Sequence, residues 1–243
     1  MAKKSAREVE RRARVEQMRR EQARKERTRS LAILGACVVL VVGLLAAALV
    51  PYVKHQREQS RIAHAKLSDL GVSVSAAKCQ GITTQKNTLA LQKDRTYHVP
   101  IGTKVNYRDA PPSYGYHWGN FLSGAELRTF YSRGDRPEVE RLVHSLEHGH
   151  TILWYDDTIK TGSKEYEQIQ QMGEKLGLDS YFMAAPWTAK DGASFPDGMH
   201  VALTHWTGKN EGVRQFCAAP SGKVVGDFVK KYPKADSTEP GAI

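Results

Sequence analysis

The feature that most constrains this chain is one uninterrupted apolar run, Leu31–Val50, which reads LAILGACVVLVVGLLAAALV. Its twenty residues carry no charge, and as a helix they would span roughly 30 Å, the thickness of the hydrocarbon core of a bilayer. The run therefore predicts one transmembrane helix. The alternative is a cleaved signal peptide, because Ala46-Ala47-Ala48 resembles a cleavage site. We favour an uncleaved signal anchor, since the charged leader and the apolar run are both longer than in an ordinary signal peptide.

The positive charge of the chain lies on the two flanks of this run. The formal net charge is +10; residues 1–30 hold twelve Lys/Arg and five Glu, and residues 51–66 hold four Lys/Arg and one Glu. These flanks supply the whole excess, so residues 67–243 are neutral overall and we expect no nucleic-acid partner. Because cationic residues concentrate on the cytoplasmic side of a membrane helix, the N-terminus is predicted to be cytoplasmic.

This topology predicts a single-pass protein of the plasma (cytoplasmic) membrane, with the bilayer around residues 31–50 and anionic lipid headgroups near the basic leader as its partners. It also divides the chain into five segments. These are a basic cytoplasmic tail (1–30), the transmembrane helix (31–50), a helical stalk (51–71), an extracytoplasmic domain (72–233) and a short polar tail expected to be disordered (234–243).

The three cysteines agree with this topology. Cys37 lies inside the apolar run, where it serves as a small apolar residue. Cys79 and Cys217 both lie in the outer segment, and in an oxidising compartment they are predicted to form one disulfide. The alternative is that they bind a metal, but neither a CxxC pattern nor an adjacent histidine supports it.

The outer segment mixes two hydrophobic periodicities. Runs rich in β-formers occur at Thr96–Pro100, Thr151–Tyr155, Tyr181–Ala185 and Met199–Trp206. Helical patterns occur at Glu138–His148, Ser163–Leu176 and Ser221–Tyr232. We therefore predict a single α+β domain with a small β-sheet and about three helices, preceded by one transmembrane helix.

The stretch LVHSLEHGH, residues 142–150, concentrates three histidines and one glutamate. In the predicted helix, an apolar stripe formed by Val139, Leu142, Val143 and Leu146 faces one way. His144 and His148 are four residues apart on nearly the opposite side, so both imidazoles can reach a single ion. Glu147 projects from a flank of the same helix.

A further ligand has to come from another segment. The loop PPSYGYHW, residues 111–118, delivers His117 among aromatic residues. Side chains alternate along a strand, so at most one of His200 and His205 is expected to join a common site. The remaining histidines, His55, His64 and His98, have no motif around them and are interpreted as ordinary surface positions.

A structural role for these residues is an equally open interpretation. Histidines at a helix C-terminus interact favourably with the helix dipole and can cap its carbonyl groups, which would account for His148 next to Gly149. Glu147 could in the same way pair with a surface cation such as Arg141. Either role requires no metal.

Two resemblances bear on this site. His144 to His148 reads H-x-x-E-H and resembles the inverzincin metalloprotease signature, which implies two histidine ligands to zinc and Glu147 as a general base. The loop PPxxGxH (111–117) with RLVHSLEHG (141–149), after a basic leader and one membrane span, resembles an uncharacterised bacterial family, common in actinobacteria, that is known only as a domain of unknown function. That resemblance extends over about 95–233 and places His117, His144, Glu147 and His148 in one recurring unit.

The hypothesis is therefore a membrane-anchored protein that binds copper or zinc through His117, His144 and His148, with Glu147 as fourth ligand or as a base beside the metal. Met199 or Met183 near the site would favour copper(I). The alternatives are a zinc-dependent hydrolase in which Glu147 activates water, and a non-catalytic envelope scaffold with structural histidines. The sequence has no phosphate-binding glycine loop and no nucleotide or flavin signature.

Overall fold

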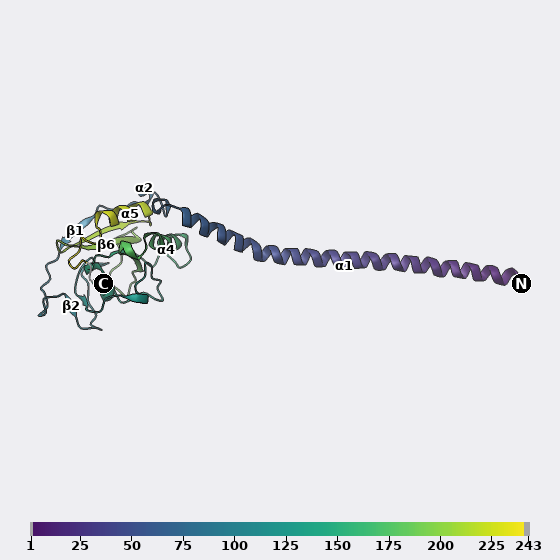
Figure 1. Ribbon diagram of the computed structural model, residues 1–243, viewed down its shortest axis with the longest axis horizontal. Helices are drawn as coiled ribbons and strands as arrows, with labels where there is room; N and C mark the ends of the chain where they lie inside the picture. Colours follow the sequence, from purple (N-terminus) through teal and green to yellow (C-terminus); the bar gives the residue numbers. More distant parts are fainter. Residues whose placement is uncertain (1, 241–243) are drawn as a thin grey trace. The chain divides into compact units, whose positions relative to one another are not determined.

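The computed structural model describes residues 2–240, which form two compact units that divide between His64 and Ala65 (Figure 1). The first unit is the helix α1, Ala2–His64. Within it, Glu16–Lys54 is long and apolar enough, by length and composition, to span a membrane. The side chains of residues 31–50 are all exposed.

The predicted stalk, 51–71, is helical over only part of its length. The helix α1 passes through Pro51 and ends at His64. Leu67 and Leu70 then pack on the core of the second unit, so the folded C-terminal unit begins about seven residues before the predicted boundary at 72.

The second unit is built on a mixed five-stranded sheet with the order β1-β7-β6-β4-β5. The strands are β1 (Thr83–Lys86), β4 (Thr151–Tyr155), β5 (Phe182–Pro186), β6 (Val201–Thr207) and β7 (Glu211–Cys217). Only the β4–β5 pair is parallel within this sheet. The α+β prediction is thus confirmed, although β1 and β7 were missed because their polar residues and Gly212 weaken the strand pattern.

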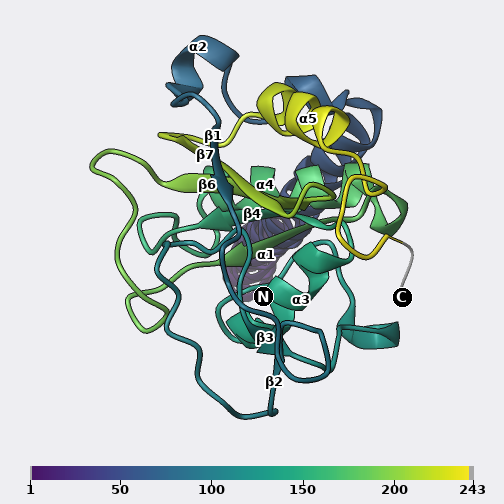
Figure 2. The same ribbon diagram turned by 90° about the vertical axis from the view of Figure 1, so that its left-hand side faces the viewer.

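Helices cover both faces of this sheet (Figure 2). They are α2 (Val74–Ala77), α3 (Val139–Glu147), α4 (Lys164–Leu176) and α5 (Gly222–Lys231). Leu153 and Tyr155 of β4 belong to the core shared with α4 and α5, while Ile152 and Trp154 belong to the core shared with α3. This alternation follows from the two-residue period of a strand.

A second, very small sheet lies beside α3. It consists of β2 (His98–Val99) and β3 (His117–Trp118), which pair in parallel. Both belong to a largely irregular segment between β1 and α3. Aromatic side chains hold this segment in place: Tyr107 donates to the Tyr116 carbonyl at 2.9 Å, and Trp118 Nε1 donates to the Thr103 carbonyl at 2.7 Å.

The predicted disulfide is confirmed: Cys79 is bonded to Cys217. It joins the segment before β1 to the last residue of β7, and both sulfurs border the core shared with α4 and α5. Cys37 is a free, exposed thiol in α1.

The C-terminal tail was predicted to be disordered, and for residues 234–240 this is wrong. Ser237 is buried, and the Asp236 carbonyl accepts a hydrogen bond from His205 Nε2 at 2.7 Å. The Glu239 amide donates to the carbonyl of Glu147 at the end of α3. Polar composition therefore did not prevent ordering, because the backbone of this segment finds partners on the domain. Residues 241–243 lie outside the described part of the chain.

Candidate metal centre

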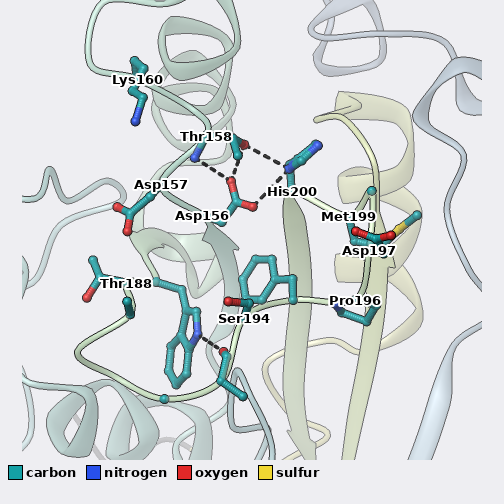
Figure 3. Close-up of a pocket in the computed structure, with 16 residues that line it drawn as sticks. Asp156, Asp157, Thr158, Lys160, Thr188, Ser194, Pro196, Asp197, Met199 and His200 are labelled. Carbon is teal, nitrogen blue, oxygen red and sulfur yellow. Dashed lines mark hydrogen bonds and ion pairs between the residues drawn. The ribbon is translucent and has the colours of Figure 1, made fainter.

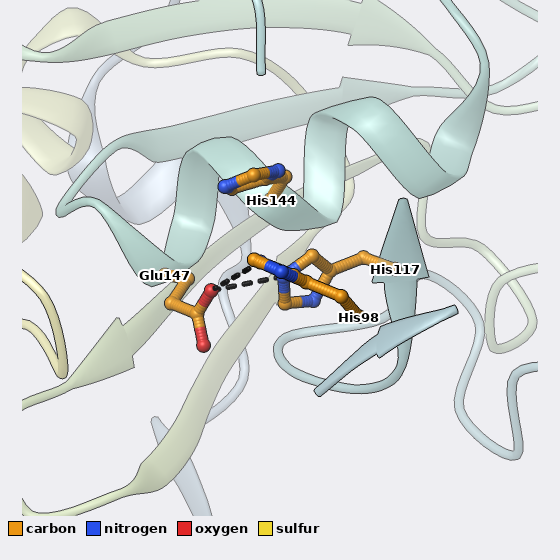
Figure 4. Close-up of side chains that lie close together, drawn as sticks. All are labelled: His98, His117, His144 and Glu147. Carbon is orange, nitrogen blue, oxygen red and sulfur yellow. Dashed lines mark ion pairs between the residues drawn. The ribbon is translucent and has the colours of Figure 1, made fainter. Parts of the chain in front are cut away.

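Four side chains with metal-binding atoms converge between α3 and the small sheet (Figure 4). They are His98, His117, His144 and Glu147, and the ligand atoms that they offer all lie within 4.8 Å of one another. Three of the four are fully buried, and the side chain of His98 is 28% exposed. A compact set of three imidazoles and one carboxylate has the composition of a four-coordinate transition-metal site.

Helix α3 provides two members of this group. Its apolar stripe packs into the core with Trp154 and Trp206, which fixes the rotation of the helix. His144 and Glu147, three residues apart, then project together on another side. They are nevertheless only 2% exposed each, because the small sheet covers that side of the helix.

Strand pairing provides the other two. His98 and His117 are direct register partners in the parallel pair of β2 and β3, so their side chains leave the ladder on the same face. Their ring centroids are 5.0 Å apart, and each ring is within 4.9 Å of the His144 ring.

Backbone carbonyl groups orient two of the imidazoles. The Nδ1 atom of His117 is 2.8 Å from the Gly115 carbonyl oxygen, and Nδ1 of His144 is 2.6 Å from the Trp118 carbonyl oxygen. A carbonyl can only accept, so Nδ1 carries the hydrogen in both rings, and in the neutral ring Nε2 carries a lone pair. This is the arrangement found around metal-binding histidines, in which the second ring nitrogen donates to a carbonyl or carboxylate.

The inner atoms of the group have no conventional hydrogen-bond partners. Nε2 of His98, Nε2 of His117 and Oε2 of Glu147 are all buried and unsatisfied. Oε2 lies 2.9 Å from His117 Nε2 and 3.7 Å from His98 Nε2. With His117 in the tautomer set by Gly115, two acceptors face each other, which is costly unless a proton or a cation lies between them.

The electrostatics favour the ligand forms of these groups. Burial, together with the neighbouring His117 and His148, lowers the pKa of His144 to about 3, so the imidazole is neutral at neutral pH. Burial raises the pKa of Glu147, but a hydrogen bond donated by a protonated His117 and the attraction of the neighbouring histidines outweigh it and leave the pKa below its ordinary value. A neutral imidazole and a carboxylate are the protonation states that bind a metal ion.

The structure brings His117, His144 and Glu147 together as the sequence predicted, but among the described residues His148 is not part of this group. Its ring centroid is 4.7 Å from that of His144, and its Nδ1 donates to the Glu239 carbonyl in the C-terminal tail. The H-x-x-E-H motif therefore does not bring both of its histidines into one ligand set here.

The fourth position is instead occupied by His98, whose interpretation as an ordinary surface residue was wrong. A strand of two residues leaves no readable periodicity, so the sequence contained no signal for its pairing with His117. Of the other histidines, His64 is exposed, and the side chain of His55 lies outside the described part of the chain. Neither His200 nor His205 joins the group.

The alternative partner suggested for Glu147 is engaged elsewhere. Arg141 binds the carboxylate of Glu126 at 2.7 Å. Aromatic rings close the remaining sides of the group: Phe121 stands edge-on to His144 and His148, and Trp206 stands edge-on to His117. Solvent therefore reaches the group most readily past His98.

The fold and the site thus define a class of protein: an α+β domain that buries three histidines and one glutamate in one group. Residues 98–243 match the model of DUF3105, a family of proteins of unknown function, and the chain belongs to that family. The matched range begins at His98 and includes all four residues of the group. No curated protein and no solved structure matches the chain.

Proposed function

We propose that this protein is a membrane-anchored metal-binding protein that holds one divalent transition-metal ion through His98, His117, His144 and Glu147. The observation that carries the proposal is the convergence of three buried, unsatisfied ligand atoms, on His98, His117 and Glu147, at one point. A positive ion at that point would satisfy all three and remove the acceptor-to-acceptor contact between His117 and Glu147.

The donor set selects the class of ion. Three imidazole nitrogens and one carboxylate oxygen suit Zn(II) or Cu(II), whereas Ca(II) and Mg(II) prefer sets made only of oxygen. Neither methionine considered from the sequence strengthens the case for copper(I). Met199 precedes β6 at the end remote from Trp206, and Met183 is a core residue of β5.

The proposed setting is the outer face of the cytoplasmic membrane. The helix that is long and apolar enough to span a bilayer has its larger cationic flank on the N-terminal side, which supports a cytoplasmic N-terminus and an extracytoplasmic C-terminal unit. The Cys79–Cys217 disulfide supports an oxidising compartment for that unit. The basic leader would lie near anionic headgroups.

Hydrolysis is the alternative that the geometry can accommodate. If three histidines held zinc and Glu147 acted only as a base, one coordination position would remain for water. Ligation by Glu147 itself would remove that base. The burial of Glu147 and its 2.9 Å contact with His117 support the role of ligand.

The test is metal content, measured by mass spectrometry on the full chain purified in detergent without a histidine tag. We expect one zinc or copper ion per chain in the parent, and none in a folded His117→Ala/His144→Ala double variant. His200→Ala, which removes a histidine outside the group, is the matched control and should keep its metal. A parent that takes up neither Zn(II) nor Cu(II) after incubation would overturn the proposal and leave the histidines with a structural role.

A further inference from the structure

A cavity lies beside the start of β6, the middle strand of the five-stranded sheet, and Figure 3 shows the residues that line it. Its volume is about 670 Å³. It opens where the parallel strands β4 and β5 end and β6 begins, next to Asp156, Trp187 and His200. Trp206, which contacts His117, is near the far end of β6, so the two sites are separated by roughly 20 Å of strand.

The wall of this cavity is held in a defined shape. It is formed largely by the loop 187–200. Trp187 Nε1 donates to the Ala193 carbonyl at 2.9 Å, and Asp191 accepts from the amide and hydroxyl of Thr188. Asp191 also pairs with Arg136 at 2.8 Å, with both side chains largely buried. Such a loop forms a cavity without first having to become ordered.

The floor of the cavity is apolar and aromatic. Trp187 and Phe195 line it but are only 2% and 8% exposed, so they present limited, fixed ring surface. Met199 adds a flexible apolar side chain at the rim. Aromatic surface of this kind binds an apolar body and favours a cation near a ring face.

The polar groups at one side of the cavity accept hydrogen bonds rather than donate them. His200 Nδ1 is 3.0 Å from Asp156 Oδ2, and the hydroxyl of Thr158 bonds to the other oxygen of the same carboxylate. A carboxylate can only accept, so in neutral His200 the Nδ1 atom carries the hydrogen and Nε2 carries the lone pair. The Asp156–His200 pair therefore offers a carboxylate and an imidazole acceptor.

The charges around the cavity also favour a positively charged group. Three aspartates and one lysine line the cavity. Asp157 is paired with Arg133 at 3.0 Å, and Arg133 also donates to the backbone carbonyl of Asp156 at 2.9 Å. Among the ion pairs of the described residues, neither the Asp156 nor the Asp197 carboxylate is joined to a Lys or Arg. In Figure 3, Lys160 lies across the cavity from Asp197. The side formed by Asp156, Asp197 and His200 is therefore negative and rich in acceptors.

We propose that this cavity binds a small organic cation, in which an ammonium group on an apolar or aromatic body places its charge between Asp156 and Asp197. The apolar body would lie against Met199 and Pro196 and against the small exposed edges of Trp187 and Phe195. An ammonium group donates three hydrogen bonds and accepts none, which matches the carboxylates and the His200 Nε2 acceptor. An anion would meet the two carboxylates directly and is excluded by the same charges.

The experiment is isothermal titration calorimetry of the full chain in detergent, with protein-free micelle blanks, against three probes that share one aromatic body. These are phenethylamine, 2-phenylethanol and phenylacetate. We expect phenethylamine to bind with a Kd below about 1 mM and at least about tenfold more tightly than phenylacetate, with the alcohol between them. Asp197→Asn removes only a charge from an exposed position and should weaken phenethylamine binding by about threefold or more.

Matched variants separate this site from the metal centre and from general charge effects. Asp179→Asn, at an exposed position before β5, should leave the affinity for phenethylamine unchanged. His117→Ala/His144→Ala should also leave it unchanged, which excludes an amine bound to a metal ion. Absence of saturable heat with phenethylamine, equal affinity for the three probes, or an unaltered affinity in Asp197→Asn would each overturn the proposal.

Discussion

His98 and His117 face one another as register partners in the parallel ladder of β2 and β3, and their rings lie 5.0 Å apart at 75°. This single pairing brings two imidazoles from an irregular segment to the helix face that carries His144 and Glu147. The Trp118 carbonyl of the same ladder accepts the Nδ1 hydrogen of His144, so one small sheet both supplies and orients ligands. The site therefore depends on β2 and β3 staying in register.

The first prediction separates His98 from His148. We expect His98→Ala to weaken Zn(II) binding by about tenfold or more, because it removes a ligand. His148→Ala should have a much smaller effect, since the His148 Nδ1 hydrogen is donated to the C-terminal tail and the residue lies outside the group. Competition against a chromophoric chelator measures both affinities. The reverse order of effects would show that the helix-borne pair His144 and His148 holds the ion.

The second prediction concerns the pH dependence of stability in the metal-free protein. Burial lowers the pKa of His150 to about 4 and of His144 to about 3, and it also lowers the pKa of His205. Each folded-state value is below the unfolded value of about 6.5. The unfolded chain therefore binds protons that the folded chain does not, and stability falls as the pH falls from about 6.5 toward 4, by at most about 1.4 kcal/mol per pH unit for each histidine.

Chemical denaturation of the chelator-treated protein between pH 7 and pH 5 measures this slope. His205→Gln should reduce it, because glutamine can still donate to the Asp236 carbonyl but binds no proton in this range. His64→Gln, at an exposed position in α1, is the control and should leave the slope as it is. A stability that is flat or rises toward pH 5 would contradict the burial of neutral histidines.

The third prediction tests the contact between the C-terminal tail and the end of α3. Gly149 has φ +92°, and a Cβ placed there would lie 2.2 Å from the Lys234 carbonyl oxygen. Gly149→Ala should therefore lower the free energy of unfolding by more than the roughly 1–2 kcal/mol that a left-handed residue alone costs. Increased hydrogen exchange at residues 234–240 should accompany this loss.

Gly102→Ala is the matched comparison for this effect. Gly102 has nearly the same backbone angle, φ +87°, but no heavy atom lies within 4 Å of its added Cβ. Gly102→Ala therefore measures the cost of the left-handed backbone angle without the cost of steric overlap. Equal destabilisation by the two substitutions would mean that the tail does not pack against Gly149 in solution.

The fourth prediction concerns the disulfide. Cys79 and Cys217 are 138 residues apart in the sequence, so in the chain-entropy model the bridge stabilises the fold by about 5 kcal/mol. Cys79→Ser/Cys217→Ser should lower the free energy of unfolding by an amount of that order. At low denaturant concentration the double variant should still bind metal, because neither cysteine belongs to the histidine group. Loss of metal binding in a variant that remains folded would indicate that the bridge positions the site.

The apolar membrane-length helix, the three main helices and the place of His144 and Glu147 on one of those helices were predictable from the sequence alone. Each depends on local spacing, since an uncharged run sets a helix length and an apolar stripe sets the rotation of a helix. The strand Thr151–Tyr155 was predicted with its observed bounds for the same reason, since it is a continuous run of β-formers. The predicted pairing of His144 with His148 in one ligand set was not found among the described residues.

Tertiary structure decided the fourth member of the site and the path of the tail. His98 joins the group through a two-residue ladder with no local signal, while His148 is turned to the Glu239 carbonyl of a tail that composition alone predicted to be disordered. The physical reason is that both outcomes depend on hydrogen bonds between different segments: a backbone ladder for His98, and a side-chain bond to a backbone carbonyl for His148. Local periodicity places a side chain on a face of its own element, and only the packing of the other segments decides what that face meets.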